Sequence, residues 1–140
     1  MSERWPKLHY ADLIGKPIAD YGRGPEFYDC LGIWLEIRGR LHLPRKDFGS
    51  LALGLTRAIS NKVFTFRSMF LPRQERKLIS AGDLVLIKSD KDPNLCAHIG
   101  TMVERGKFLH TCRTMNVHRS DTDHPLWRQM IEGIYEFVGG

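Results

Sequence analysis

The fold of this chain is decided by the stretch Gly22-Arg23-Gly24-Pro25-Glu26-Phe27-Tyr28-Asp29-Cys30-Leu31-Gly32-Ile33-Trp34-Leu35-Glu36-Ile37. Glycine and proline break its first half into a loop, and the apolar residues after Asp29 recur at helical spacing. The pattern predicts a helix over residues 30–38, ended by Gly39. Cys30 then lies in the first helical turn, where backbone N–H groups and the helix dipole favour a thiolate. It is therefore a candidate nucleophile, and the alternative is a small packing residue.

The composition is that of a globular protein. Of the 140 residues, 42% are hydrophobic and 26% are charged, which predicts one domain over residues 1–140 with its own core. The net charge is +5, with a basic patch at residues 73–77. This charge suits an anionic polymer, either nucleic acid or cell wall, but a solvated basic surface is the commoner explanation. A nucleic-acid-binding module is the weaker alternative because no basic stripe with interleaved aromatic residues is present.

The three cysteines, Cys30, Cys96 and Cys112, do not predict a disulfide framework, because their number is odd and their spacing is wide. No CxxC or HExxH motif is present, so we expect neither a metal nor a cofactor. A metal set of His98, His110 and one of the two later cysteines is a rival reading of the same residues.

The N-terminal residues 1–7 are polar and lack the apolar segment of a secretory signal peptide. No run approaches the roughly 18–20 apolar residues that a membrane span requires. The sequence therefore predicts a soluble chain that is made in the cytoplasm and has no membrane span.

Helical patterns precede strand patterns along the chain, which predicts an α+β fold. The apolar period changes from helical to alternating after residue 80. Helices are predicted at residues 9–14, 30–38, 47–60 and 125–132, and strands at 63–66, 84–87, 97–103, 107–112 and 134–138. Residues 71–76 are predicted as a basic loop, and 117–118 as a continuation of the β-meander.

Two histidines fall on a predicted hairpin with its turn at residues 104–106. His98 begins one strand and His110 ends the other, so we expect them nearly opposite each other, on one face and within hydrogen-bonding reach. A cysteine nucleophile needs a base, and the base needs a group that orients it. Cys30, His98 and His110 supply these three parts, unless the histidines are structural residues of the strands.

Five short motifs follow one another in the order that a known peptidase family shows. They are Tyr28-Asp29-Cys30-Leu31-Gly32, Leu43-Pro44-Arg45, Gly82-Asp83-Leu84-Val85-Leu86, His98-Ile99-Gly100 and Gly106-Lys107-Phe108-Leu109-His110. In these motifs the chain resembles the NlpC-type, papain-like cysteine peptidases of bacterial cell walls. The resemblance implies a papain-like NlpC fold, in which N-terminal helices pack on a small antiparallel β-sheet.

The resemblance also implies roles for five residues. Cys30 would be the catalytic nucleophile, His98 the base and His110 the third polar residue of a Cys-His-His triad. Asp29 would bind the amino group of the substrate, and Tyr21 would serve the oxyanion or substrate pocket. The family cleaves peptidoglycan stem peptides, typically next to a γ-linked D-glutamate. The implied activity is therefore that of a cysteine peptidase acting as a peptidoglycan hydrolase.

Two positions depart from the pattern of many cell-wall members. Leu31 stands where they have serine, and it is similar to the variant found in tail peptidases of phages and gene-transfer agents. With the missing signal peptide, it predicts an enzyme made in the host cytoplasm, carried with other tail-tip proteins in the virion tail tip and acting on the periplasmic cell wall. Ala19 stands where they have the first tyrosine of a pair. It supports the alternative of a catalytically silent structural component of the tail tip.

Overall fold

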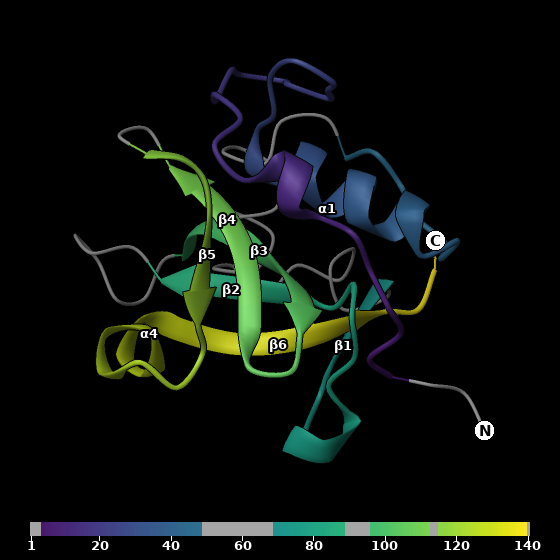
Figure 1. Cartoon of the computed structure of the whole chain (residues 1–140). Helices are drawn as coiled ribbons and strands as arrows, with labels where there is room; N and C mark the ends of the chain where they lie inside the picture. The colour runs from purple at the N-terminus through teal and green to yellow at the C-terminus, as the bar shows by residue number, and fades with distance from the viewer. Residues whose placement is uncertain (1–3, 49–68, 89–95, 113–114, 140) are drawn as a thin grey trace.

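The structure is a computed structural model, and it describes residues 4–48, 69–88, 96–112 and 115–139 (Figure 1). Its elements are η1 (Ala11–Leu13), α1 (Cys30–Arg40), β1 (Phe70–Pro72), η2 (Arg76–Leu78), β2 (Leu84–Lys88), β3 (Cys96–Glu104), β4 (Lys107–Cys112), β5 (Met115–Asp121), α4 (Pro125–Met130) and β6 (Ile131–Phe137). An N-terminal helix followed by strands confirms the predicted α+β class.

The strands form one six-stranded sheet in the order β1-β6-β2-β3-β4-β5, and every pair in it is antiparallel. Strands β2 to β5 make the predicted meander, in which Gly106 turns between β3 and β4 with a φ of 74°. A positive φ is the conformation that glycine adopts most easily, which is why the turn forms there. The last strand, β6, returns to pair with β2, and β1 adds to its outer edge.

The first helix, α1, packs against β3 and β4 (Figure 1). Its residue Trp34 is fully buried and meets Phe70 of β1 and Phe137 of β6, with ring centroids 5.8 and 5.4 Å away. The indole Nε1 donates a hydrogen bond to the carbonyl oxygen of Gly82 (3.1 Å), so the polar atom of this core residue is satisfied. Trp34 thereby holds the helix on the sheet.

No helix among the described residues is long and apolar enough to cross a membrane.

A second apolar cluster contains Val85, Ile87, Met102 and Phe108. These side chains alternate along their strands with those that pack toward α1, as the two-residue period of a strand requires. Trp127 of α4 packs against this second cluster, with its ring 5.5 Å from that of Phe108. The short helix α4 thus buries apolar residues that α1 does not reach.

The end of α1 differs from the prediction. The helix continues through Gly39 to Arg40, and the left-handed residue that follows it is His42, with a φ of 56°. Arg40 holds the last turn in place, because its Nε donates to Glu36 (3.0 Å) and its Nη1 donates to Asp12 (2.7 Å). The prediction that Gly39 ends the helix was wrong, because these contacts of Arg40 keep the last turn helical.

Four other predictions also differ from the structure. The segment predicted as a helix over 9–14 forms only the single turn η1, and α4 ends at Met130 instead of 132. Ile131 already pairs with Ile87 in the sheet, so β6 begins before the predicted residue 134. Part of the predicted loop 71–76 pairs with β6 as β1. The predicted helix over 47–60 lies almost entirely outside the described residues, and the predicted strand at 63–66 lies wholly outside them.

Candidate active site

The loop before α1 folds back onto the start of the helix. The backbone N–H of Tyr28 donates to the carbonyl of Pro17 (3.1 Å), and the N–H of Asp29 donates to that of Gly22 (3.1 Å). A Cβ atom at Gly32 in the first turn of α1 would overlap the carbonyl oxygen of Gly22. This close approach explains why glycine occupies a helical position, where it is normally unfavourable.

Asp29 caps the helix. Its Oδ1 accepts hydrogen bonds from the backbone N–H of Gly32 (2.6 Å) and from Nη1 of Arg23 (2.8 Å). Arg23 also donates through Nε to Asp47 (2.8 Å), so it ties the helix start to a later segment. The side chain of Asp29 is 17% exposed. A capping carboxylate satisfies an N–H that the helix leaves open, and the predicted contact of Asp29 with a substrate amino group stays a prediction.

Cys30 is the first residue of α1, and its side chain packs against the apolar cluster that contains Leu31, Trp34 and Ile99. Burial raises the pKa of the Cys30 thiol to about 11, although the backbone N–H of Ile99 acts in the opposite direction. The backbone N–H groups of Cys30 and Leu31 lower this pKa, as expected at a helix start, but they do not set its net direction. The loss of solvation outweighs the helix-terminus effect, and the resting cysteine is a neutral thiol at neutral pH.

His98 and His110 come together on β3 and β4. Their rings are nearly parallel, at 11°, with centroids 6.0 Å apart. The register pairs Thr101 with Leu109 and Met102 with Phe108, so the two histidines are offset by two residues instead of directly opposite. Diagonal neighbours of this kind are still within reach of ring side chains. The rings stack without the hydrogen bond that the hairpin prediction expected.

His110 is almost completely buried, and its Nε2 lies 2.9 Å from Oγ of Ser120 on β5. The pKa of His110 is lowered to about 3, mainly by burial and in smaller part by the positive charges that His118 and His98 would carry. The imidazole is therefore neutral near pH 7. Its Nδ1 is buried and accepts or donates no hydrogen bond in the structure.

Two further residues contact His110, and neither was predicted from the sequence to belong to the site. His118 lies directly opposite His110 in the β4–β5 register, and the ring centroids are 3.9 Å apart. Ser120 lies two residues further along β5 and contacts the same imidazole. The alternation of a β-strand would have put both on the face of His110, had the β4–β5 register been known.

The structure places Cys30 against β3 at the N–H of Ile99, one residue beyond His98. Within the described part of the chain, no hydrogen bond joins the thiol to an imidazole. Catalytic hydrogen bonds are often long in structures without substrate and shorten in the complex. The thiol therefore lies against the backbone of β3, one residue beyond His98.

Tyr21 is 62% exposed and has a φ of 60°, which is uncommon for a residue other than glycine. It lies in a tight turn closed by the N–H of Gly22 donating to the carbonyl of Ala19 (2.9 Å). An exposed tyrosine held in a left-handed conformation is suited to contact a ligand, and the predicted pocket role of Tyr21 stays a prediction.

The alternative that His98, His110 and a later cysteine bind a metal gains no support from the described residues. No three side chains of histidine, cysteine, aspartate or glutamate converge there in a way that would hold an ion. The side chains of Cys96 and Cys112 lie outside the part that the structure describes.

The fold is similar to that of solved structures described as NlpC or NLP/P60 proteins. NlpC2 from Trichomonas vaginalis matches with a TM-score of 0.60 at 16% identity, covering 99% of this chain and 51% of that one. NlpC1 from the same organism gives 0.60 at 18% identity, with coverage of 96% and 48%. An NLP/P60 family protein of Staphylococcus aureus, described as similar to a lipoprotein, gives 0.53 at 17% identity, with coverage of 91% and 38%.

The chain thus has an NlpC-type fold, as the motifs predicted, and spans about half or less of the length of these proteins. No protein-family model and no curated protein matches its sequence.

A thiol at a helix start, beside a β-hairpin that carries a histidine pair, has the parts that acyl transfer requires. Cys30 supplies a nucleophilic atom, His98 is the nearer histidine along β3, and the neutral His110 stacks on it. Such a set can cleave an amide once the thiol proton moves to an imidazole.

Proposed function

We propose that the protein is a cysteine endopeptidase that cleaves peptidoglycan stem peptides next to a γ-linked D-glutamate. The observation that carries this proposal is the position of Cys30 at the start of α1, against the backbone N–H of Ile99, the residue that follows His98 on β3. The NlpC-type fold adds support, because solved structures with this fold are described as NlpC or NLP/P60 proteins. The fold by itself does not define the reaction.

In the proposed reaction, His98 accepts the proton of the Cys30 thiol as the sulfur attacks the scissile carbonyl carbon. Because burial raises the thiol pKa, we expect the proton transfer to His98 to accompany the attack. Backbone N–H groups at the start of α1 stabilise the oxyanion. The imidazolium then protonates the leaving amine, and water hydrolyses the thioester to a carboxylic acid and the free thiol. His110, neutral at this pH, positions His98 by ring contact.

We also propose a tail-tip setting for this activity. It rests on the sequence resemblance at Leu31, a fully buried residue that packs beside Trp34 under the helix start. An enzyme held in a virion tail tip with other tail proteins would reach the periplasmic wall at infection. Its product would be a local opening in the peptidoglycan.

Digestion of purified peptidoglycan tests the proposed activity. We expect the full chain to release stem-peptide fragments whose masses correspond to cleavage beside the γ-linked D-glutamate. Walls of the meso-diaminopimelate type and of the lysine type should be digested in parallel, with fragments identified by mass spectrometry, because the difference between them reports substrate preference. Intact stem peptides after digestion of both wall types would contradict the proposal.

The raised thiol pKa and the alanine at position 19 favour a second candidate, a catalytically silent structural protein with the same fold. The rate of iodoacetamide alkylation of Cys30 between about pH 5 and 10 separates the two. For a thiol that passes its proton to His98, the rate should level off above about pH 7, where imidazole is neutral. This plateau should disappear in a His98→Ala variant.

An isolated buried thiol would behave differently. Its rate would rise about tenfold per pH unit toward a pKa of about 11, in the native chain and in His98→Ala alike. That profile would favour the silent protein.

A further inference from the structure

Arg38 of α1 is a buried cation without a carboxylate partner. Only 4% of the residue is exposed, and its Nε and Nη1 donate to the backbone carbonyls of Pro44 (2.9 Å) and Gly82 (3.2 Å). The guanidinium also lies over the rings of Trp34 and Phe137, 5.4 and 5.6 Å from their centroids. Among the described residues, none places a carboxylate within ion-pair distance of it. A buried charge in this state is costly, and an anion beside it would relieve that cost.

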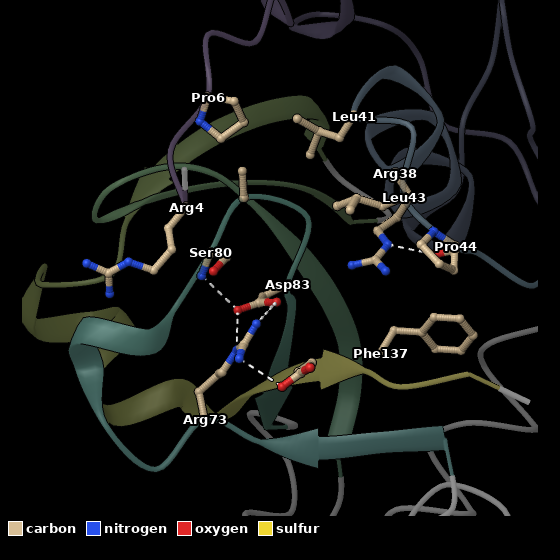
Figure 2. Close-up of a pocket in the computed structure, with 12 residues that line it drawn as sticks. Arg4, Pro6, Arg38, Leu41, Leu43, Pro44, Arg73, Ser80, Asp83 and Phe137 are labelled. Carbon is tan, nitrogen blue, oxygen red and sulfur yellow. Dashed lines mark hydrogen bonds and ion pairs between the residues drawn. The ribbon is translucent and has the colours of Figure 1, made fainter. Parts of the chain in front are cut away.

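This guanidinium enters a cavity of about 370 Å³ at the C-terminal end of α1 (Figure 2). The size is within the range of pockets that bind small ligands. Apolar side chains form much of the wall, and they belong to Pro6, Leu41, Leu43, Pro44, Ala81 and Phe137. The cavity therefore combines one buried cationic group with an apolar surface.

The acidic groups of the cavity are already engaged. Asp83 accepts from Nε of Arg73 (2.9 Å) and from the N–H of Ser80 (2.8 Å), and Glu136 accepts from Nη1 of Arg73 (2.8 Å) (Figure 2). These two carboxylates are therefore satisfied by Arg73, and Arg38 has donor capacity left because its Nη2 has no hydrogen-bond partner in the described residues.

We propose that this cavity binds the carboxylate of a small monoanionic ligand with an apolar body, such as the C-terminal end of a short peptide. The Arg38 fork matches a carboxylate in shape, and the apolar wall covers the rest of the ligand. The wall carries three guanidinium groups, of Arg4, Arg38 and Arg73, and two carboxylates, of Asp83 and Glu136, so its net charge suits a monoanion better than a dianion such as phosphate. Arg38 lies eight residues after Cys30 on α1, about 12 Å away at 1.5 Å per residue. Binding in the cavity therefore does not depend on the proposed peptidase chemistry.

The test uses the full chain labelled with ¹⁵N, followed by NMR. N-acetyl-alanyl-alanine should shift the Nε–H resonance of Arg38 and the amide of Ala81, with a dissociation constant on the order of 1 mM. The neutral N-acetyl-alanyl-alaninamide should leave both resonances in place. Sodium propionate decides the source of the carboxylate: weaker binding than the peptide supports a peptide end, and equal binding supports a free small acid.

Two variants keep the proposal falsifiable. Arg38→Gln should weaken binding at least about tenfold, the effect of a charge-assisted contact, and Leu43→Trp should block the cavity while leaving the arginine in place. Arg40→Gln is the matched control, since Arg40 pairs with Asp12 and Glu36 outside the cavity. No shift with either acid, equal shifts with the alaninamide, or undiminished binding by Leu43→Trp would overturn the proposal.

Discussion

Replacing Gly32 with alanine should lower the free energy of unfolding by about 1–3 kcal/mol, the usual cost of overpacking, and slow peptide cleavage by roughly 100-fold. An alanine in a helix is normally more stable than a glycine by about 1 kcal/mol, so the expected sign is opposite to that of helix propensity. The new Cβ would overlap the carbonyl oxygen of Gly22, which is backbone and cannot rotate away. The loop carrying Tyr21 would therefore move away from Cys30. Urea unfolding and the rate of fragment release measure the two effects.

Gly39→Ala is the matched control because it changes a glycine of the same helix. A Cβ there would meet only Nη1 of Arg45, the end of a flexible side chain that can move aside. We expect this variant to keep its activity and to gain up to about 1 kcal/mol in stability. If Gly32→Ala were as stable and as active as Gly39→Ala, the loop would not be positioned through Gly22.

The parts of the fold that depend on local pattern were predictable from the sequence. The helix that begins at Cys30 follows from its apolar spacing and from the cap at Asp29, and the hairpin between β3 and β4 follows from strand alternation around Gly106. These two features bring Cys30 and His98 into one region. The NlpC-type fold was likewise reached from short motifs in order.

The parts that depend on pairing across the chain were not predictable. The insertion of β6 between β1 and β2 joins residues at least 44 positions apart, and nothing local to Phe70 indicates that it pairs with Phe137. The contact of His118 with His110 was not predicted for the same reason, because it depends on the β4–β5 register. Long-range register is set by packing, which a single sequence does not display.

The pKa of Cys30 also depends on one effect that the sequence shows and on another that only the fold shows. The helix-terminus effect on Cys30 is visible in the sequence because it depends on the neighbours of the residue. Its burial beneath β3 is visible only in the fold, and burial dominates in raising the thiol pKa to about 11. In the proposed reaction His98 therefore activates Cys30, because the helix-terminus effect is smaller than the cost of burial.

The Cys30→Ala variant should lose fragment release from peptidoglycan by at least about 10⁴-fold, the effect of removing a catalytic nucleophile. The chain should keep its fold, because the substitution removes one partly buried sulfur atom and leaves the N-cap at Asp29 unchanged. Matching circular dichroism spectra and an unfolding midpoint close to that of the native chain would establish this. Gly39→Ala, which we expect to keep its activity, is the control for a substitution in the same helix, and it should digest the wall normally.

The comparison of the native chain with Cys30→Ala on the same purified peptidoglycan tests the central claim most directly. Mass spectrometry should find stem-peptide fragments after incubation with the native chain and with Gly39→Ala, and only background after incubation with Cys30→Ala. Release of the same fragments by a folded Cys30→Ala variant, at a rate near that of the native chain, would contradict the assignment of Cys30 as the nucleophile.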